Sequence, residues 1–474
     1  MSDPLSGGIA DLAARIRSGA TTPTRLAEAA LAALEADGRR LNAVVTLTRD
    51  LALAEAARAE ADLAAGIDRG PLHGIPYGAK DLLATAGIPT AWGAGPLKDQ
   101  VFDHDAAVVE RLRAAGATLV AKLAMVEIAG GFGYEQANAS FTGPGRNAWD
   151  ADAWAGGSSS GSGAAVAAGL VPYAIGSETW GSITTPAAFN GITGLRPTYG
   201  RVSRRGAMAL SWTMDKIGPM ARSADDCGLV LAAIADPDSA GSARGDRPPA
   251  LGASTQVVSA PAGGFRFGVL RAAVAAADPA VAANAEAALA VLAEVGTLVD
   301  VELPDFPYAA AASVIVLAEA AAAFEDFIAD GLAAGLAAPE DRVGLLDAQT
   351  LPAVDYLRAL RLRRLAGCAL DALLARYDAI VAPTLLFVAP PLSAPFASYF
   401  GRDAGPSLGA AGNLCGLPAI TVPTGFGDRG LPTGLELMGR AFGEDRLLDA
   451  ARAYQARTDW HTRRPPSAAT TTPP

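Results

Sequence analysis

The chain is poor in cysteine and histidine, with three of each among its 474 residues. Cys227, Cys368 and Cys415 are far apart, and an odd, sparse count supplies neither a disulfide framework nor a zinc site. We therefore expect a reducing compartment, and the sequence implies no metal ion and no cofactor.

The scarcity of histidine also bears on catalysis. His104 lies in an Asp-His-Asp run at the start of a predicted helix, which favours a solvated or capping role, and His461 lies beside a predicted disordered tail. Only His73 is left. A hydrolase of the Ser-His-Asp type has few candidate parts in this chain.

Basic residues are outnumbered, with 38 Lys and Arg against 49 Asp and Glu, which gives a net charge of −11. No Lys/Arg-rich run is present, and an acidic chain is a poor counter-ion for phosphate, so we expect no nucleic-acid partner. The longest apolar stretch, residues 308–324, is interrupted by Glu319 and too short to span a bilayer. The first residues lack a basic start and an apolar signal core. These features predict a cytoplasmic protein without a membrane partner.

Strand-like and helix-like segments alternate along the chain, which predicts an α/β fold whose sheet is covered by helices on both faces. No internal repeat is present. Residues 236–264 resemble a linker, and the tail after Arg463 is expected to be disordered. The predicted helices cover residues 8–36 (two helices), 50–65, 105–115, 162–169, 225–235, 278–295 and 444–457, with more helix within 308–376. The predicted strands cover residues 74–79, 118–121, 172–176, 265–270, 297–303, 378–382, 419–422 and 433–438.

Two turns rich in glycine and serine are the most informative feature. The first, Gly-Gly-Ser-Ser-Ser-Gly-Ser-Gly from position 156, contains Ser158, and the second, Gly-Ser-Glu-Thr-Trp-Gly-Ser from position 176, ends at Ser182. A tightly packing, alanine-rich segment separates them, which is unlike a flexible linker. Glycines in such turns let the backbone approach a ligand closely or adopt dihedrals that other residues avoid.

Residues 157–161 match the G-x-S-x-G nucleophile elbow of α/β-hydrolases. That motif needs a strand directly before it and a histidine downstream. Residues 147–154, however, have the character of a loop. We therefore reject this interpretation of the serine run.

A lysine can replace histidine as the base only if it is neutral. A lysine at its reference pKa of about 10.4 is charged at pH 7. Full burial lowers that pKa by up to about 3–5 units. Lys80 follows an apolar, strand-like approach over residues 74–79 that could place it inside the protein. A lysine taken alone is usually a solvated surface group, and the two serine turns make Lys80 a candidate.

The chain resembles the amidase signature family along nearly its whole length, because several independent motifs occur in the order in which that family has them. The motifs are Leu-His-Gly-Ile-Pro-Tyr-Gly-Ala-Lys-Asp from position 72, the serine run from 156, Asn-Gly-Ile-Thr-Gly-Leu-Arg-Pro from 190, Asp-Lys-Ile-Gly-Pro from 215 and Gly-Leu-Pro-Ala-Ile-Thr-Val-Pro from 416. The resemblance implies one large domain, residues 1–463, with a mixed sheet between helical layers.

The resemblance also implies roles for three side chains. Ser182 would be the acyl-accepting nucleophile, Ser158 a bridging serine held by a cis peptide bond, and Lys80 the base. The main-chain N–H groups of Thr179, Trp180, Gly181 and Ser182 would stabilise the oxyanion.

The second turn departs from the family pattern at two positions. Where the family usually has Asp-Thr-Gly-Gly-Ser, this chain has Glu178 at the first position and Trp180 at the third. The indole of Trp180 either faces the acyl group at the pocket mouth or packs into the core, and its N–H stays usable only if the position does not need a positive φ. Many members have an arginine where this chain has Thr184, and the missing cation favours a neutral, apolar substrate.

Residues 128–136 precede the first serine turn and are candidates for the pocket lining. Gly130, Gly131, Phe132 and Tyr134, together with Trp180, would form an aryl-accepting surface. The alternative is that these side chains belong to the core.

The leading hypothesis is therefore hydrolysis of non-peptide carboxylic amide C–N bonds in small, neutral apolar or aryl substrates. Carbamates (urethanes) and esters are close variants, because the same addition step serves their carbonyl groups. One alternative is the glutamine-hydrolysing A subunit of a tRNA-dependent amidotransferase, which acts with partner subunits. Another is a catalytically idle binding protein.

Overall fold

The computed structural model describes residues 3–236, 264–400 and 407–466. Within them, one mixed sheet of eleven strands has the order β1-β3-β2-β4-β6-β5-β10-β11-β9-β7-β8. The strands are β1 (Val44–Leu47), β2 (Pro76–Lys80), β3 (Thr118–Leu123), β4 (Tyr173–Glu178), β5 (Thr193–Arg196), β6 (Lys216–Ala221), β7 (Phe265–Val269), β8 (Gly296–Asp300), β9 (Ala379–Pro383), β10 (Ala419–Phe426) and β11 (Pro432–Met438).

The sheet combines parallel and antiparallel pairs. Strand β2 is parallel to both β3 and β4, and β7 is parallel to both β8 and β9. Between these groups, β4–β6, β6–β5, β5–β10, β10–β11 and β11–β9 are antiparallel. The predicted α/β class and the mixed sheet are confirmed.

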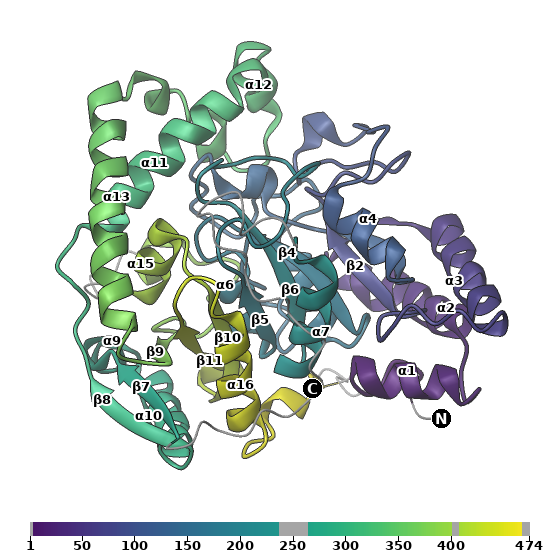
Figure 1. Ribbon diagram of the computed structural model, residues 1–474. Helices are drawn as coiled ribbons and strands as arrows, with labels where there is room; N and C mark the ends of the chain where they lie inside the picture. The colour runs from purple at the N-terminus through teal and green to yellow at the C-terminus, as the bar shows by residue number, and fades with distance from the viewer. Residues whose placement is uncertain (1–2, 237–263, 401–406, 467–474) are drawn as a thin grey trace, which may run out of the picture.

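Helices surround this sheet, as Figure 1 shows. The helices are α1 (Ile9–Arg17), α2 (Pro23–Ala33), α3 (Arg49–Ala64), α4 (Ala107–Ala114), α5 (Ser160–Ala167), α6 (Thr184–Asn190), α7 (Ala224–Ile234), α9 (Arg271–Ala276), α10 (Pro279–Ala293), α11 (Tyr308–Ala323), α12 (Glu325–Ala329), α13 (Ala353–Leu374), α14 (Ala397–Phe400), α15 (Leu408–Cys415) and α16 (Glu444–Gln455). Helices α1–α4 lie near the β1 end of the sheet, and α9 and α10 lie near the β8 end (Figure 1).

Strand β10 shows how both faces of the sheet become buried. Its Ile420 and Val422 belong to the same hydrophobic cluster as Leu447 of α16. Its Ala419 belongs to a second cluster, which contains Leu414 of α15. Because successive strand residues point to opposite faces, α16 and α15 cover opposite faces of the sheet. Burial on both sides also explains why β9, with the sequence Ala-Ile-Val-Ala-Pro, is an apolar run without alternation.

The predicted β-α-β unit after residue 264 is confirmed as β7, α10 and β8, with the short α9 in addition. The sequence did not predict β1, β5 and β6. Strand β6 contains Lys216, Gly218 and Pro219, residues that rarely signal a strand, yet all its positions are buried. The predicted linker lies almost entirely outside the described residues, as do the last eight residues of the predicted tail.

The apolar segment over residues 308–324 corresponds to α11. Its Glu319 is buried and accepts hydrogen bonds from Ser211 Oγ (2.5 Å), Thr213 Oγ1 (2.9 Å) and Tyr356 Oη (2.8 Å). In the described part of the chain, no helix has the length and apolar character needed to cross a bilayer.

Candidate active site

Lys80 is the last residue of β2, and every residue of that strand is buried between β3 and β4. The close packing depends on small residues: a Cβ on Gly78 would lie 2.3 Å from Leu123 Cδ1. Lys80 itself has no exposed surface. The predicted internal position of this lysine is confirmed.

The Lys80 amine contacts two serines. Its Nζ lies 2.7 Å from Ser158 Oγ and 2.9 Å from Ser177 Oγ, and it donates to the Ser177 carbonyl at 3.3 Å. Burial lowers the pKa of Lys80 to about 7, although the negative charges of Asp215 and Glu178 act in the opposite direction. The amine is therefore neutral in a large fraction of molecules at neutral pH, and it can then accept a proton.

The first serine turn presents Ser158 to this amine. The Gly157–Ser158 peptide bond is cis, and the Ser158 carbonyl accepts a hydrogen bond from the Val126 N–H at 3.0 Å. Helix α5 follows directly. A Cβ on Gly161, the second residue of α5, would lie 2.4 Å from the Ala43 carbonyl oxygen, so only glycine fits at this position.

The second turn connects β4 to α6 and carries Ser182 near the first. The Ser159 N–H donates to the Ser182 carbonyl at 3.3 Å, and Ser159 Oγ donates to the Ser177 carbonyl at 3.2 Å. Ser182 is buried, with 7% of its surface exposed. The fold thus brings Lys80, Ser158 and the turn that ends at Ser182 into one site.

The Glu178 carboxylate anchors the start of α6. Its Oε2 accepts hydrogen bonds from the N–H groups of Ile183 (2.8 Å) and Thr184 (3.0 Å), and its Oε1 accepts from Arg196 Nη1 (2.7 Å) and Asn413 Nδ2 (2.8 Å). Burial alone would raise the pKa of Glu178, but the positive charge of Arg196 and the other donors hold it at about 2. Glu178, which is one methylene longer than the usual aspartate, therefore holds the second turn in place through these hydrogen bonds.

Four consecutive main-chain N–H groups of this turn remain available. Among the described residues, the N–H groups of Thr179, Trp180, Gly181 and Ser182 have no hydrogen-bond acceptor. Gly181 has a φ of 83°, whereas Trp180 is not among the residues with positive φ. The tryptophan is therefore compatible with a turn whose donors point to an oxyanion.

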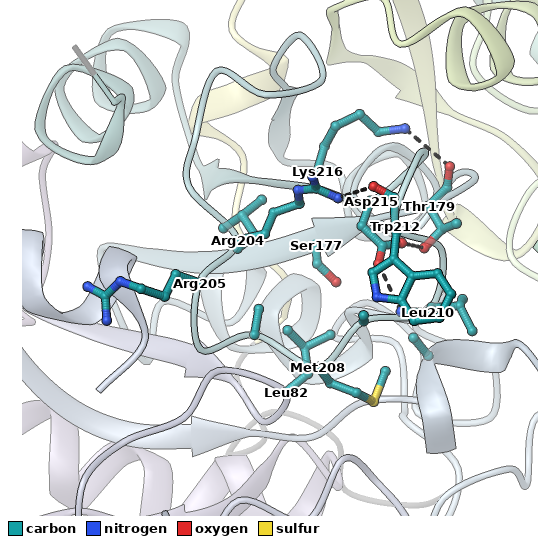
Figure 2. Close-up of a pocket in the computed structure, with 14 residues that line it drawn as sticks. Leu82, Ser177, Thr179, Arg204, Arg205, Met208, Leu210, Trp212, Asp215 and Lys216 are labelled. Carbon is teal, nitrogen blue, oxygen red and sulfur yellow. Dashed lines mark hydrogen bonds between the residues drawn. The ribbon is translucent and has the colours of Figure 1, made fainter. Parts of the chain in front are cut away.

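A cavity of about 390 Å³ is lined by Ser177, the second serine that contacts Lys80. Figure 2 shows this cavity. Figure 2 shows Ser177, Thr179, Asp215 and Lys216 gathered on its wall. Asp215 accepts a 2.6 Å hydrogen bond from Thr179 Oγ1, and Lys216 Nζ donates to the Thr179 carbonyl at 3.2 Å. These contacts hold the start of the second turn against β6. We call this space the Ser177 cavity.

A larger cavity of about 740 Å³ lies on the Gly181 side of the turn, and we call it the Trp180 cavity. Trp180 is 37% exposed and lines it, so the alternative that the indole packs into the core is wrong. Most of the wall is apolar. The aromatic side chains that line it are Trp180, Phe306, Tyr308, Phe387, Tyr399 and Phe400.

Comparison with known proteins agrees with this arrangement. The family model described as Amidase matches residues 25–448. The chain belongs to the amidase signature family. The resemblance seen in the sequence motifs is thereby confirmed.

The proteins that this chain resembles include enzymes with different names. The chain is 38% identical to the A subunit of a glutamyl-tRNA(Gln) amidotransferase from Methylococcus capsulatus, over 96% of this chain and 98% of that protein. Native peptide amidase from Stenotrophomonas maltophilia is 34% identical, with a TM-score of 0.86 and coverage of 98% and 99% of the two chains. A 6-aminohexanoate cyclic dimer hydrolase is 27% identical, with a TM-score of 0.83 over 97% of this chain and 99% of the other.

Of residues 128–136, Ala129 lines the Ser177 cavity, whereas the side chains expected to form the pocket wall lie elsewhere. Phe132 is buried, with its ring centroid 5.6 Å from that of Phe324 and 6.1 Å from that of Phe327, so the core alternative holds for this side chain. Tyr134 packs edge-on against Trp154. Neither Phe132 nor Tyr134 lines the Ser177 or Trp180 cavity, and the same is true of Gly130 and Gly131.

Tyr134 nevertheless lies near the serine turn, because a Cβ on Gly157 would lie 3.3 Å from its hydroxyl oxygen.

No histidine forms a hydrogen bond with Lys80, whose partners are Ser158 and Ser177. His104 is partly exposed and pairs with Asp103 at 3.0 Å. Among the described residues, no group of three or more His, Cys, Asp or Glu side chains could hold a metal ion.

Sequence analysis missed the residues that support the two turns. Ser177 contacts the lysine directly, and the charged supports are Glu178, Arg196, Asp215 and Lys216. Arg196 and the Asp215–Lys216 pair lie within the family motifs. Their roles depend on strands β5 and β6, which the sequence did not predict.

Proposed function

We propose that this amidase hydrolyses non-peptide carboxylic amide C–N bonds through an acyl-enzyme at Ser182, with Ser158 and Lys80 as a proton relay. The observation that carries the proposal is the buried Lys80 amine, 2.7 Å from Ser158 Oγ, with a pKa lowered by burial to about 7. A neutral amine in contact with a hydroxyl is a competent general base at neutral pH.

In the first step, the Ser182 hydroxyl attacks the carbonyl carbon. Its proton passes to Ser158 Oγ as the Ser158 proton passes to Lys80 Nζ. The tetrahedral intermediate then collapses, the C–N bond breaks, and the relay returns the proton to the departing nitrogen. Water attacks the acyl-enzyme in the same way and releases the carboxylic acid together with free Ser182.

The N–H groups of residues 179–182, which have no acceptor in the described part of the chain, support oxyanion stabilisation in both steps. Donors fixed before the reaction need no reorganisation as charge develops, and removal of one such donor from other hydrolases costs about 10²–10³ in kcat. Glu178 anchors this turn from the α6 side and Asp215 from the β6 side.

The Trp180 cavity supports neutral apolar or aryl substrates. Its wall is mainly aromatic and aliphatic, and position 184 provides a threonine hydroxyl where an arginine would favour an anion. Carbamates and esters fit the same chemistry, since their carbonyl groups undergo the same addition.

A second candidate function is favoured by the curated relatives, which are named as amidotransferase A subunits and are 37–39% identical over more than nine-tenths of this chain. This chain would then hydrolyse glutamine within a complex with partner proteins. Trp180 and Thr184 are the departures that weigh against it. A glutaminase assay and gel filtration of the purified chain distinguish the two candidates.

The test of the first candidate is a panel of p-nitroanilides, aliphatic amides, aryl carbamates and glutamine, assayed with wild type and Ser182→Ala. Turnover of aryl amides that disappears in Ser182→Ala supports the proposal. Turnover of glutamine alone supports the second candidate. A fluorophosphonate that labels neither protein, or labels both equally, would indicate an idle binding protein or another nucleophile.

A further inference from the structure

The Trp180 cavity contains one acidic residue, Glu436 of β11. Every other described residue that lines this cavity is uncharged. Glu436 is buried, with 1% of its surface exposed. A carboxylate in such a wall is costly unless it has a partner, so its surroundings need an explanation.

Glu436 has only part of an ion pair. Its Oε1 lies 3.3 Å from Arg196 Nη2, and no hydrogen bond to this oxygen comes from the described residues. Arg196 is already bound to Glu178 through Nη1 at 2.7 Å and donates from Nε to the Leu417 carbonyl at 3.1 Å. The Arg196 guanidinium is therefore shared by two buried carboxylates, and its contact with Glu178 (2.7 Å) is shorter than its contact with Glu436 (3.3 Å).

The other cation nearby does not compensate Glu436. Lys216 donates to the Asn413 side-chain oxygen at 2.7 Å and to the Thr179 carbonyl. Burial lowers the pKa of Lys216 well below its ordinary value. In the same cluster, burial raises the pKa of Glu436 to about 7 in spite of Arg196. Among the described residues, this acid in the cavity wall therefore lacks a full counter-charge.

We propose that Glu436 is a specificity-determining residue that pairs with a cationic nitrogen on the acyl part of an aromatic amide substrate. The inference rests on the proposed amide hydrolysis and changes one part of it: the aryl group of the substrate carries an ammonium, where the apolar wall and Thr184 alone would favour a neutral group. The ring would pack among the aromatic side chains of the wall, and the ammonium would supply the missing charge.

The aromatic walls favour the same class of ligand. Phe387 lies in edge contact with Tyr399 at 5.3 Å and with Phe400 at 5.0 Å between ring centroids, so three rings of the wall form one cluster. Aromatic faces attract both aryl groups and cations. A carboxylate that lines the same cavity as this cluster selects an aromatic cation over an aromatic anion.

The experiment compares two substrates of nearly equal shape, 4-(aminomethyl)benzamide and 4-ethylbenzamide, by ammonia release. In wild type we expect kcat/KM to be about tenfold or more higher for the ammonium compound, the size of one hydrogen bond to a charged group. In Glu436→Gln this ratio should fall to near unity, mainly through KM, and Glu436→Asp should restore part of it.

Glu444→Gln is the matched control, because Glu444 is an equally buried acid that accepts a hydrogen bond from the Thr198 N–H at 2.7 Å and does not line the cavity. The substrate ratio should stay at the wild-type value in this variant. Thermal melting of all variants identifies any that fail to fold. The ratio of kcat/KM values for the two substrates in wild type tests the inference without any variant.

The outcomes separate this inference from the proposed function. Hydrolysis of both compounds by wild type without a preference for the ammonium overturns the role of Glu436 and leaves amide hydrolysis intact. If neither compound is hydrolysed, calorimetric titration of Ser182→Ala decides: tighter binding of the ammonium compound supports Glu436 as its partner, and equal or absent binding overturns it. Retention of the wild-type ratio in a folded Glu436→Gln also overturns it.

Discussion

The Lys80 amine lies 2.7 Å from the Ser158 hydroxyl, and both residues are buried. Water does not solvate the ammonium form at this position, which is why the pKa falls toward neutrality. The same contact joins residues that are 78 positions apart in the chain. The charge state of the lysine therefore depends on packing between segments that only the fold brings together.

The rate of amide hydrolysis should depend on pH through Lys80. Because its pKa is lowered to about 7, the protonated form predominates below that pH and cannot act as a base. We expect kcat/KM to fall about tenfold per pH unit on the acid side and to level off on the alkaline side. A pH–rate profile between about 5 and 9 checks this. A profile that is flat across the acid limb would contradict the proposed base.

Substitutions at the relay should have graded effects. Ser182→Ala should abolish turnover, Lys80→Ala should lower kcat by at least about 10³-fold, and Ser158→Ala should cost less than Lys80→Ala. Steady-state kinetics together with fluorophosphonate labelling measure these effects. Wild-type activity in Lys80→Ala would be incompatible with the mechanism.

Loss of the Glu178 carboxylate should destabilise the protein. Glu178→Ala leaves the Arg196 guanidinium short of its better partner and frees two N–H groups at the start of α6, and the loss of one partner of a buried ion pair costs about 3–5 kcal/mol. Urea unfolding measures the difference. The control is Glu35→Ala, which removes an exposed pair with Arg39 and should cost under about 1 kcal/mol. Similar losses in the two variants would show that Glu178 does not anchor the turn.

The two cavities can be distinguished by their exposed tryptophans. Trp180 lines the larger cavity and Trp212 the Ser177 cavity. If aryl acyl groups occupy the Trp180 cavity, Trp180→Ala should raise KM for an aryl amide about tenfold, since it removes a large aromatic contact. Trp212→Ala should change KM much less. The reverse order of KM values, measured with one p-nitroanilide, would place the aryl group in the Ser177 cavity.

Local patterns in the sequence identified much of the fold. The 3.6-residue spacing of apolar side chains predicted α1, α2 and α4, and apolar segments predicted β7 and β11, because these signals come from neighbours in the chain. Strands β5 and β6 were missed because they are short or contain glycine and proline, and only their burial between other strands makes them extended.

The candidate site divides in the same way. Lys80, Ser158 and Ser182 were predicted from motifs, and the structure brings the lysine, the first serine and the turn of the second together. The lining of the pocket was not predictable: Phe132 packs in the core, while Phe387 and Tyr399 come from a later segment with no recognisable pattern. Contacts between such distant segments carry no local signal.

The sequence by itself determined the class of fold and the family, and it predicted the serine and lysine residues of the site. Only the tertiary structure decided that Lys80 is sealed from water, that Trp180 faces a cavity, and that Arg196 is shared by Glu178 and Glu436. The physical reason is that the charge state of a lysine, the exposure of an indole and the balance of an ion cluster depend on what packs around them. Those neighbours come from strands and helices far apart in the chain.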